Sequence, residues 1–183
     1  MPLRAHEAYE LNELLMGCVT TIESMGVFLN QAKDPELKGI LQKQLDAHIQ
    51  DYNIKVEWAE AGSSSQKLRV PAMPSKMSGT PKPPQQVEPN PNSKAFDDRG
   101  IATAYLRGLK ANGKSYAAAA FEADEPQLRQ FLEDAFTMCS HHAFEVAGWM
   151  RKNGFYPGVE ASKSYMQDLA QTYAPVRQPV GMH

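Results

Sequence analysis

The chain has 183 residues, of which 42% are hydrophobic and 22% are charged, and its formal net charge is −2. This length and composition suit one globular domain, 1–183, and the near-neutral charge gives no reason to expect binding to nucleic acid or to a membrane surface. No apolar run approaches the roughly 20 residues of a membrane span. The polar first ten residues, with Glu7 and Glu10, lack the layout of a secretory signal, so we expect synthesis in a cytosol.

Residues 8–62 are predicted to form the first of two helical hairpins. Apolar residues recur in steps of three and four as far as residue 32, which is typical of one helical stripe. Asp34 can cap a second helix and Pro35 fits its first turn; we expect that helix to end near Gly62. The side chains expected to face inward are Leu11, Leu14, Leu15, Cys18, Ile22, Met25 and Leu29, followed by Leu37, Leu41, Leu45, His48, Tyr52, Val56 and Ala59.

Residues 62–94 hold seven of the 13 prolines and no aromatic residue, so they are neither helix nor central strand. Two interpretations remain open: a disordered linker, or an extended crossover that runs along the bundle. At about 3 Å per residue the segment spans roughly 100 Å, far more than the length of a bundle. We favour a partly docked crossover whose first half is pinned by Leu68, Val70, Met73 and Met77.

Residues 97–154 are predicted to form the second hairpin, which starts near Phe96. Its third helix is rich in small residues, and Gly108 would allow a neighbouring helix to approach closely, unless Gly108 or Gly113 only kinks or ends the helix. The fourth helix is expected to end at Asn153-Gly154 in a left-handed cap. The tail, 155–183, is expected to hold a short helix over about 159–173. The inward side chains are expected to be Ala102, Leu106, Leu109, Gly113, Tyr116, Ala117 and Ala120, then Leu128, Leu132, Ala135, Cys139, His142, Val146 and Trp149.

The two hairpins repeat each other. A shift of 91 positions (126 minus 35) places Pro35 on Pro126 and brings the two tryptophans of the chain, Trp58 and Trp149, onto each other. The same shift superimposes Gly17 on Gly108. A duplicated hairpin predicts an all-α protein built as a four-helix bundle.

Six side chains are the candidates for a metal centre. In bundles that hold a carboxylate-bridged pair of metal ions, two helices each give a glutamate and the other two each give a Glu-x-x-His pair. Here Glu23 and Glu122 accompany two pairs in the reverse order, His48-x-x-Asp51 and His142-x-x-Glu145. The glutamates lie beside the apolar stripes, where charged residues are typical of a solvated face, and a neutral histidine can be satisfied in a core without metal. We therefore expect no metal, no cofactor and no catalytic residue.

The remaining candidates are thiols and aromatic side chains. Cys18 and Cys139 lie among apolar residues and are expected to be small buried side chains rather than reactive thiols. The turn Phe155-Tyr156-Pro157 either covers the end of the bundle or presents a contact patch to a partner, and it is our candidate interaction site. The other aromatic residues of the second hairpin are expected to pack in the core, namely Tyr105, Tyr116, Phe121, Phe131, Phe136 and Phe144.

One run of motifs resembles the spore coat protein F (coat F) family of endospore-forming bacteria. It comprises Ala-Tyr-Leu-Arg-Gly-Leu-Lys at 104–110, Ser-Tyr-Ala at 115–117, Pro-Gln-Leu-Arg-Gln-Phe-Leu at 126–132, Glu-Val at 145–146 and Met-x-x-x-Gly-Phe-Tyr-Pro at 150–157. The Asp-Pro-Glu-Leu hairpin at 34–37 resembles the same family's ferritin-like helix pair. The resemblance covers roughly 8–62 and 97–157.

The resemblance implies a ferritin-like fold, synthesis in the mother-cell cytoplasm during sporulation, and deposition in the spore coat. It also implies other spore coat proteins as partners and transfers no catalytic residue. The expected function is that of a structural, non-enzymatic assembly protein, with a homodimer as a further possibility. The alternative is a ferritin-like di-iron or di-manganese oxidoreductase acting on peroxide or oxygen.

Overall fold

The computed structural model describes residues 3–76 and 79–176. Within these ranges the protein is all-helical and contains no strand, so the predicted fold class is confirmed. Two long hairpins are followed by a short helix. The helices are α1 (Ala5–Gln31), α2 (Pro35–Ala61), α3 (Asp98–Glu122), α4 (Pro126–Lys152) and α5 (Lys163–Thr172).

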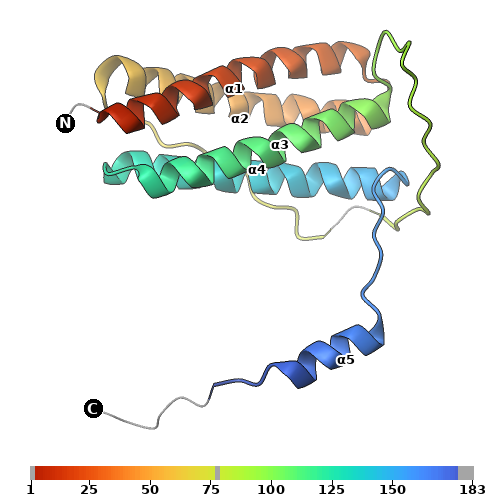
Figure 1. The fold of residues 1–183 in the computed structure, drawn as a ribbon. Coiled ribbons are helices and arrows are strands. Elements are labelled where there is room, and N and C mark those ends of the chain that lie inside the picture. Colours follow the sequence, from red (N-terminus) through yellow and green to blue (C-terminus); the bar gives the residue numbers. More distant parts are fainter. Residues whose placement is uncertain (1–2, 77–78, 177–183) are drawn as a thin grey trace.

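The four long helices form a bundle in which α2 and α3 run in the same direction (Figure 1). The crossover returns the chain to the end of the bundle where α2 begins, as the side chain of Asp98 shows. At the start of α3, this carboxylate accepts hydrogen bonds from the backbone N–H groups of Lys33 and Asp34, in the α1–α2 turn, at 2.7 and 3.1 Å. In the bundle, α1 packs against α2 and α3, and α4 packs against the same two helices.

The helix ends follow the predicted signals. Asp34 caps α2 by accepting a hydrogen bond from the backbone N–H of Leu37 at 2.8 Å, and Pro35 occupies the first turn. After α4, Gly154 takes a left-handed conformation with φ of 76°. A Cβ atom at Gly154 would lie 2.6 Å from the carbonyl oxygen of Pro83. Glycine is thus required there both by the backbone angle and by the close approach of the crossover.

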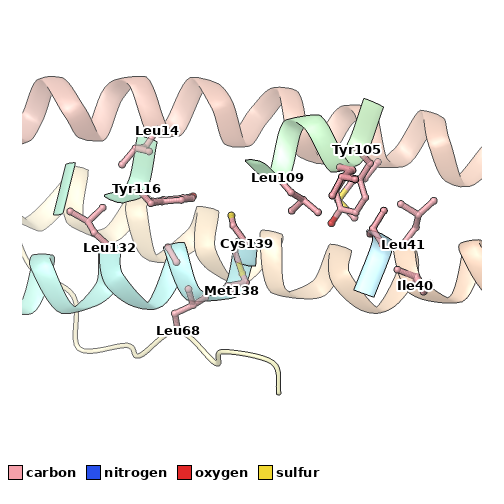
Figure 2. Close-up of a cluster of buried hydrophobic side chains, with 14 of the residues drawn as sticks. Leu14, Ile40, Leu41, Leu68, Tyr105, Leu109, Tyr116, Leu132, Met138 and Cys139 are labelled. Atoms are coloured by element: carbon pink, nitrogen blue, oxygen red, sulfur yellow. The ribbon is translucent and has the colours of Figure 1, made fainter. Parts of the chain in front are cut away.

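The core is filled mainly by the stripes predicted for α1, α3 and α4, although some predicted members are only half-buried, namely Leu15, Ile22, Leu29 and Ala117. Leu14, Leu109 and Leu132 lie in one buried cluster contributed by these three helices (Figure 2). On α4 every side chain of the predicted stripe is buried. The prediction of a core position is wrong for two aromatic residues, because Phe121 is 80% exposed and Phe136 is 44% exposed. Their residue types suit a core, but their positions on the helices turn them to solvent.

The predicted inward face of α2 is partly wrong. Leu45, Tyr52 and Val56 are only half-buried and Ala59 is exposed. The inward face is offset by about one residue from the predicted face and carries several polar residues. Hydrophobicity alone therefore points to positions beside the inward face. The buried residues of α2 are Leu37, Ile40, Leu41, Gln44, His48, Asp51, Ile54, Lys55 and Trp58.

The proline-rich segment is partly docked on the bundle, as we favoured. Leu68 is 6% exposed and points from the crossover toward Met138 of α4 (Figure 2). The ring Nδ1 of His141 lies 2.6 Å from the carbonyl oxygen of Pro71, to which it donates. Of the other residues predicted to hold the crossover on the bundle, Val70 is half-buried, Met73 is 50% exposed, and Met77 lies outside the described residues. Further along, the backbone N–H of Gln85 donates to the carbonyl of Gly154 at 3.0 Å.

The tail contains the predicted short helix, which begins at Lys163 rather than near residue 159. No residue of α5 is buried. In Figure 1 this helix lies apart from the bundle, on the side of α4.

Candidate functional site

The middle of the bundle contains a set of buried polar side chains, which we call the polar centre. It is contributed mainly by α2, with members from the other three long helices. Each member is at most 3% exposed. The polar centre consists of Cys18, Gln44, His48, Asp51, Lys55, Tyr105, Tyr116 and His142.

One half of the polar centre is a buried ion pair. The ammonium group of Lys55 lies 2.5 Å from the carboxylate Oδ2 of Asp51, and neither side chain is exposed to solvent. The hydroxyl of Tyr116 donates to the same Oδ2 at 2.6 Å and accepts from Lys55 at 2.7 Å. The ammonium also lies 4.9 Å from the centroid of the Tyr116 ring. Because an isolated buried charge is very costly, Asp51 and Lys55 each require the other in this interior.

Both cysteines are buried as predicted, but the surroundings of Cys18 are not purely apolar. Its thiol donates to Asp51 Oδ2, with the sulfur 3.1 Å from that oxygen. Burial, followed by the charge of Asp51, raises the pKa of Cys18 to about 11. Burial and the same charge also raise the pKa of Cys139 far above that of an ordinary thiol. Both thiols are therefore protonated at neutral pH, which disfavours nucleophilic chemistry.

The other half of the polar centre is a directed chain of hydrogen bonds. The hydroxyl of Tyr105 donates to Gln44 Oε1 at 2.8 Å, so it accepts from Nε2 of His48, which lies 3.0 Å away. This arrangement places the proton of the neutral His48 ring on Nε2. The amide of Gln44 then donates to Glu145 at 2.9 Å, and the chain ends at that partly exposed carboxylate.

His142 faces His48 across the interior, with the two ring centroids 5.2 Å apart. Among the described residues, neither ring nitrogen of His142 has a hydrogen-bond partner. Burial lowers the pKa of His48 to about 4, although the charge of Asp51 opposes the shift. Burial, followed by the neighbouring His48, lowers the pKa of His142 to about 3. Both rings are therefore neutral at pH 7.

The six candidate ligands do not fit a di-metal centre. Glu23 on α1 and Glu122 at the end of α3 are exposed. Glu145 is bound by Lys43, at 2.6 Å, and by Gln44, while Asp51 is bound by Lys55. Only His48 and His142 are brought together. In the part of the chain that the structure describes, no three His, Cys, Asp or Glu residues form a group that could hold a metal ion.

The aromatic turn lies against the end of the bundle. The Phe155 ring packs on Trp149 with centroids 5.7 Å apart, and the Tyr156 hydroxyl accepts a hydrogen bond from Lys110 at 3.0 Å. That hydrogen bond and the charge of Lys110 lower the pKa of Tyr156. Pro157 is exposed. The turn thus covers the end of the bundle with two of its side chains, and its role as a contact patch stays a prediction.

Residues 97–159 match the model of the Coat F domain, a segment that runs through α3, α4 and the aromatic turn. The second hairpin is therefore similar to the Coat F domain. Over 175 residues the chain is 26% identical to the spore coat protein F-like protein YhcQ of Bacillus subtilis (strain 168), covering 94% of this chain and 81% of that protein. The family resemblance predicted from the motifs is confirmed.

A solved crystal structure supports the overall fold. It is that of a Bacillus halodurans C-125 protein provisionally assigned as a spore coat protein. The TM-score is 0.66 at 14% sequence identity, with 88% of this chain and 98% of the other covered. At that identity the likeness concerns the fold alone. In the described residues, no helix combines the length and apolar character needed to cross a membrane.

The polar centre joins the Coat F-like second hairpin to the first hairpin. Tyr105, Tyr116 and His142 come from the segment that matches the Coat F model, whereas the ion pair comes from α2. Sequence reasoning missed Lys55 and Gln44 because it followed hydrophobicity. A signal was present, since Gln44, His48, Asp51 and Lys55 are spaced by four, three and four, and therefore share one face of a helix.

Proposed function

We propose that this protein is a structural component of the bacterial spore coat that acts by binding other coat proteins and not by catalysis. The observation that carries the proposal is the match of 97–159 to the Coat F domain, together with the similarity to the coat F-like protein of Bacillus subtilis over most of both chains. Partners are accordingly sought among other proteins of the coat.

The chemistry of the interior supports a scaffold. Asp51 is neutralised by Lys55, and both histidines of the polar centre are held neutral. Every member is at most 3% exposed, so a substrate has no access without opening the bundle. The groups available to partners are therefore on the surface. The Phe155-Tyr156-Pro157 turn is our candidate contact surface. Its Pro157 is exposed, while Phe155 packs on Trp149 and Tyr156 is bound by Lys110.

We further propose synthesis in the mother-cell cytoplasm followed by deposition on the spore. A fluorescent fusion expressed in sporulating Bacillus subtilis should form a ring around the forespore and be recovered in the extracted coat fraction. The fluorescent protein alone is the control. Signal retained inside the spore core, or diffuse in the mother cell at the end of sporulation, would contradict the proposal.

The aromatic turn can be tested in the same assay. Pro157→Asp adds a charge to an exposed position and should weaken deposition without unfolding the bundle. Val176→Asp is the matched control, because Val176 is 91% exposed but lies beyond α5. Equal deposition of both variants would remove the turn from the contact surface and leave the coat assignment standing.

The alternative, a di-metal oxidoreductase, has no support from the arrangement of its six candidate ligands. Elemental analysis of protein purified without chelators tests it directly. Near-stoichiometric iron or manganese that is lost in Glu145→Ala would favour the oxidoreductase over the scaffold.

A further inference from the structure

The short helix α5 has an apolar face that its own bundle does not cover. Tyr165 and Leu169 are spaced by four and share one side of the helix with Met166, and Tyr173 follows directly after the helix end. Tyr165 is 58% exposed, Met166 53% and Tyr173 74%. An isolated helix of ten residues is marginal in water, because its few hydrogen bonds do not offset the entropy of nucleation. A second surface is therefore needed to hold α5 in this form.

The bundle offers such a surface in a groove between α1 and α3. Along α1 the groove runs from Glu13 to Phe28, and Tyr105, Gly108 and Leu109 line it on α3. The sixteen residues of α1 from Glu13 to Phe28 correspond to roughly 24 Å, and the ten residues of α5 to roughly 15 Å, so the helix fits the length of the groove. A Cβ atom added at Gly108 would meet no atom within 4 Å. The missing side chain thus faces open space.

The groove carries its own uncovered apolar side chains. Met16, at its rim, is 60% exposed. Where it continues toward the end of α1, Val27 is 50% exposed and Phe96 is 54% exposed. Covering these side chains and the apolar face of α5 together removes both from water, which is the main driving force for association.

The position of the tail favours a second copy as the source of the helix. The tail is anchored by Phe155 on Trp149 and leaves the bundle on the side of α4, whereas the groove lies between α1 and α3 (Figure 1). To fill its own groove, α5 would have to turn back across α3. Glu13 and Glu23 border the groove and have no ion pair in the described chain, so they suit Lys163 at the start of an incoming α5.

We propose that α5 of one copy docks in the α1–α3 groove of a second copy, and that the exchange is reciprocal. Each copy carries both the helix and the groove, so two equal contacts close a dimer with twofold symmetry. The inference is independent of the coat assignment, because it uses only the apolar face, the groove and the direction of the tail.

The mass of the full-length protein in solution, measured over a concentration series, tests the proposal. We expect a dimer. Leu169→Glu should raise the dissociation constant roughly tenfold or more, because it places a charge on the docked face. Gly108→Phe should do the same by filling the groove. Gly39→Phe is the matched control, since Gly39 is an exposed helical position on α2 that also has no atom within 4 Å of an added Cβ.

Mixing the two weakened variants separates exchange between copies from other contacts. A Leu169→Glu chain keeps its groove and a Gly108→Phe chain keeps its helix, so the mixture should form heterodimers held by one intact contact, more stable than either variant's homodimer. Circular dichroism checks that each variant retains the bundle. A wild-type protein that stays monomeric at every concentration would overturn the proposal. If α5 were protected from hydrogen exchange in that monomer, the helix would occupy the groove of its own chain. A dimer unaffected by either substitution would overturn it as well.

Discussion

Glu7 and Asp98 stand 91 positions apart and perform the same task at opposite ends of the bundle. The carboxylate of Glu7, in the first turn of α1, accepts two backbone N–H groups of the α3–α4 turn at 2.9 and 3.1 Å. The carboxylate of Asp98, in the first turn of α3, accepts two backbone N–H groups of the α1–α2 turn at 2.7 and 3.1 Å. Each hairpin thus fastens the turn of the other, and the sequence repeat is also a structural one.

The same symmetry explains the groove between α1 and α3. Thr21 and Asn112 are also 91 positions apart (112 minus 21), and the Asn112 amide donates to the Thr21 hydroxyl at 3.0 Å. Two equivalent positions of a repeat contact each other only where the axis relating the halves passes between them. Gly17 and Gly108, another equivalent pair, line the groove beside this contact. The open groove is therefore a consequence of small residues duplicated on either side of the axis.

The first prediction concerns the carboxylate of Glu7. Burial alone would raise the pKa of Glu7, but backbone N–H groups of Arg4, Glu125 and Asp124 bind the ionised form and lower it. Glu7→Ala removes this acceptor and leaves those N–H groups without it, so we expect a loss of about 1–3 kcal/mol in the free energy of unfolding. Urea denaturation at pH 7 measures the loss. Glu13→Ala, at an exposed position of the same helix, is the control and should change stability little.

The sign of the pH dependence gives Glu7 a second test. A carboxylate with a lowered pKa in the folded state contributes stability above its unfolded pKa, and the contribution disappears as the pH falls through the folded value. Wild type and Glu7→Ala should therefore differ most at neutral pH and converge in acid. A difference that grows on acidification would contradict this role for the side chain.

Much of the fold could be predicted, because local signals and the repeat agree. Asp34-Pro35 marks a turn and a helix start by rules that depend on a few neighbouring residues, and Pro126 repeats them in the second hairpin. Asn153-Gly154 marks a helix end in the same way. The direction of α3 relative to α2 could not be predicted, because a proline-rich segment of this length reaches either end of the bundle.

The polar centre was the part least accessible to sequence reasoning. Hydrophobic periodicity assumes that buried positions are apolar, so it left Asp51 off the predicted inward face of α2 and passed over Lys55. Their burial depends on each other and on Tyr116, which lies 61 positions from Lys55 and is brought to it only by the fold. Conversely, Glu23 and Glu122 matched a ligand pattern only because each lies on one of the other two helices, and the fold leaves both exposed.

The second prediction concerns the buried ion pair. Lys55→Met leaves the Asp51 carboxylate buried without its cation, and we expect a loss of about 3–5 kcal/mol in the free energy of unfolding. Adding Asp51→Leu to the same chain should recover most of that loss, since it removes the uncompensated charge. Lys43→Met breaks the more exposed pair with Glu145 and should cost at most about 1 kcal/mol. A double variant no more stable than Lys55→Met would show that packing, and not charge, dominates.

The third prediction concerns the two histidines of the polar centre. The folded pKa values of about 4 for His48 and about 3 for His142 lie below the ordinary value of 6.5. The unfolded chain therefore binds protons that the folded chain rejects. Stability should be full above pH 6.5 and should fall as the pH drops toward 4, with a slope of up to about 1.4 kcal/mol per pH unit for each ring.

His142→Leu isolates one of these two contributions. Because the ring nitrogens of His142 have no partner among the described residues, leucine should leave stability at pH 7 unchanged or higher and should flatten the decline between pH 6.5 and 5. His6→Gln, at an exposed position, is the control and should leave the decline as it is in the wild type. Urea midpoints at several pH values in this range give the comparison. A steeper decline in His142→Leu would count against a neutral buried ring.

The fourth prediction concerns the junction of the crossover with α4. Gly154→Ala forces a side chain into a left-handed backbone and against the carbonyl of Pro83, so we expect a loss of roughly 1–2 kcal/mol from the backbone angle, with a further loss from the contact. Gly39→Ala, in the exposed middle of a helix, should instead stabilise the protein by up to about 1 kcal/mol. Hydrogen exchange provides the local measurement: the amide of Gln85, which is bonded to the Gly154 carbonyl, should lose protection in Gly154→Ala and keep it in Gly39→Ala. Unchanged protection of Gln85 in Gly154→Ala would mean that the crossover is held at this end by other contacts.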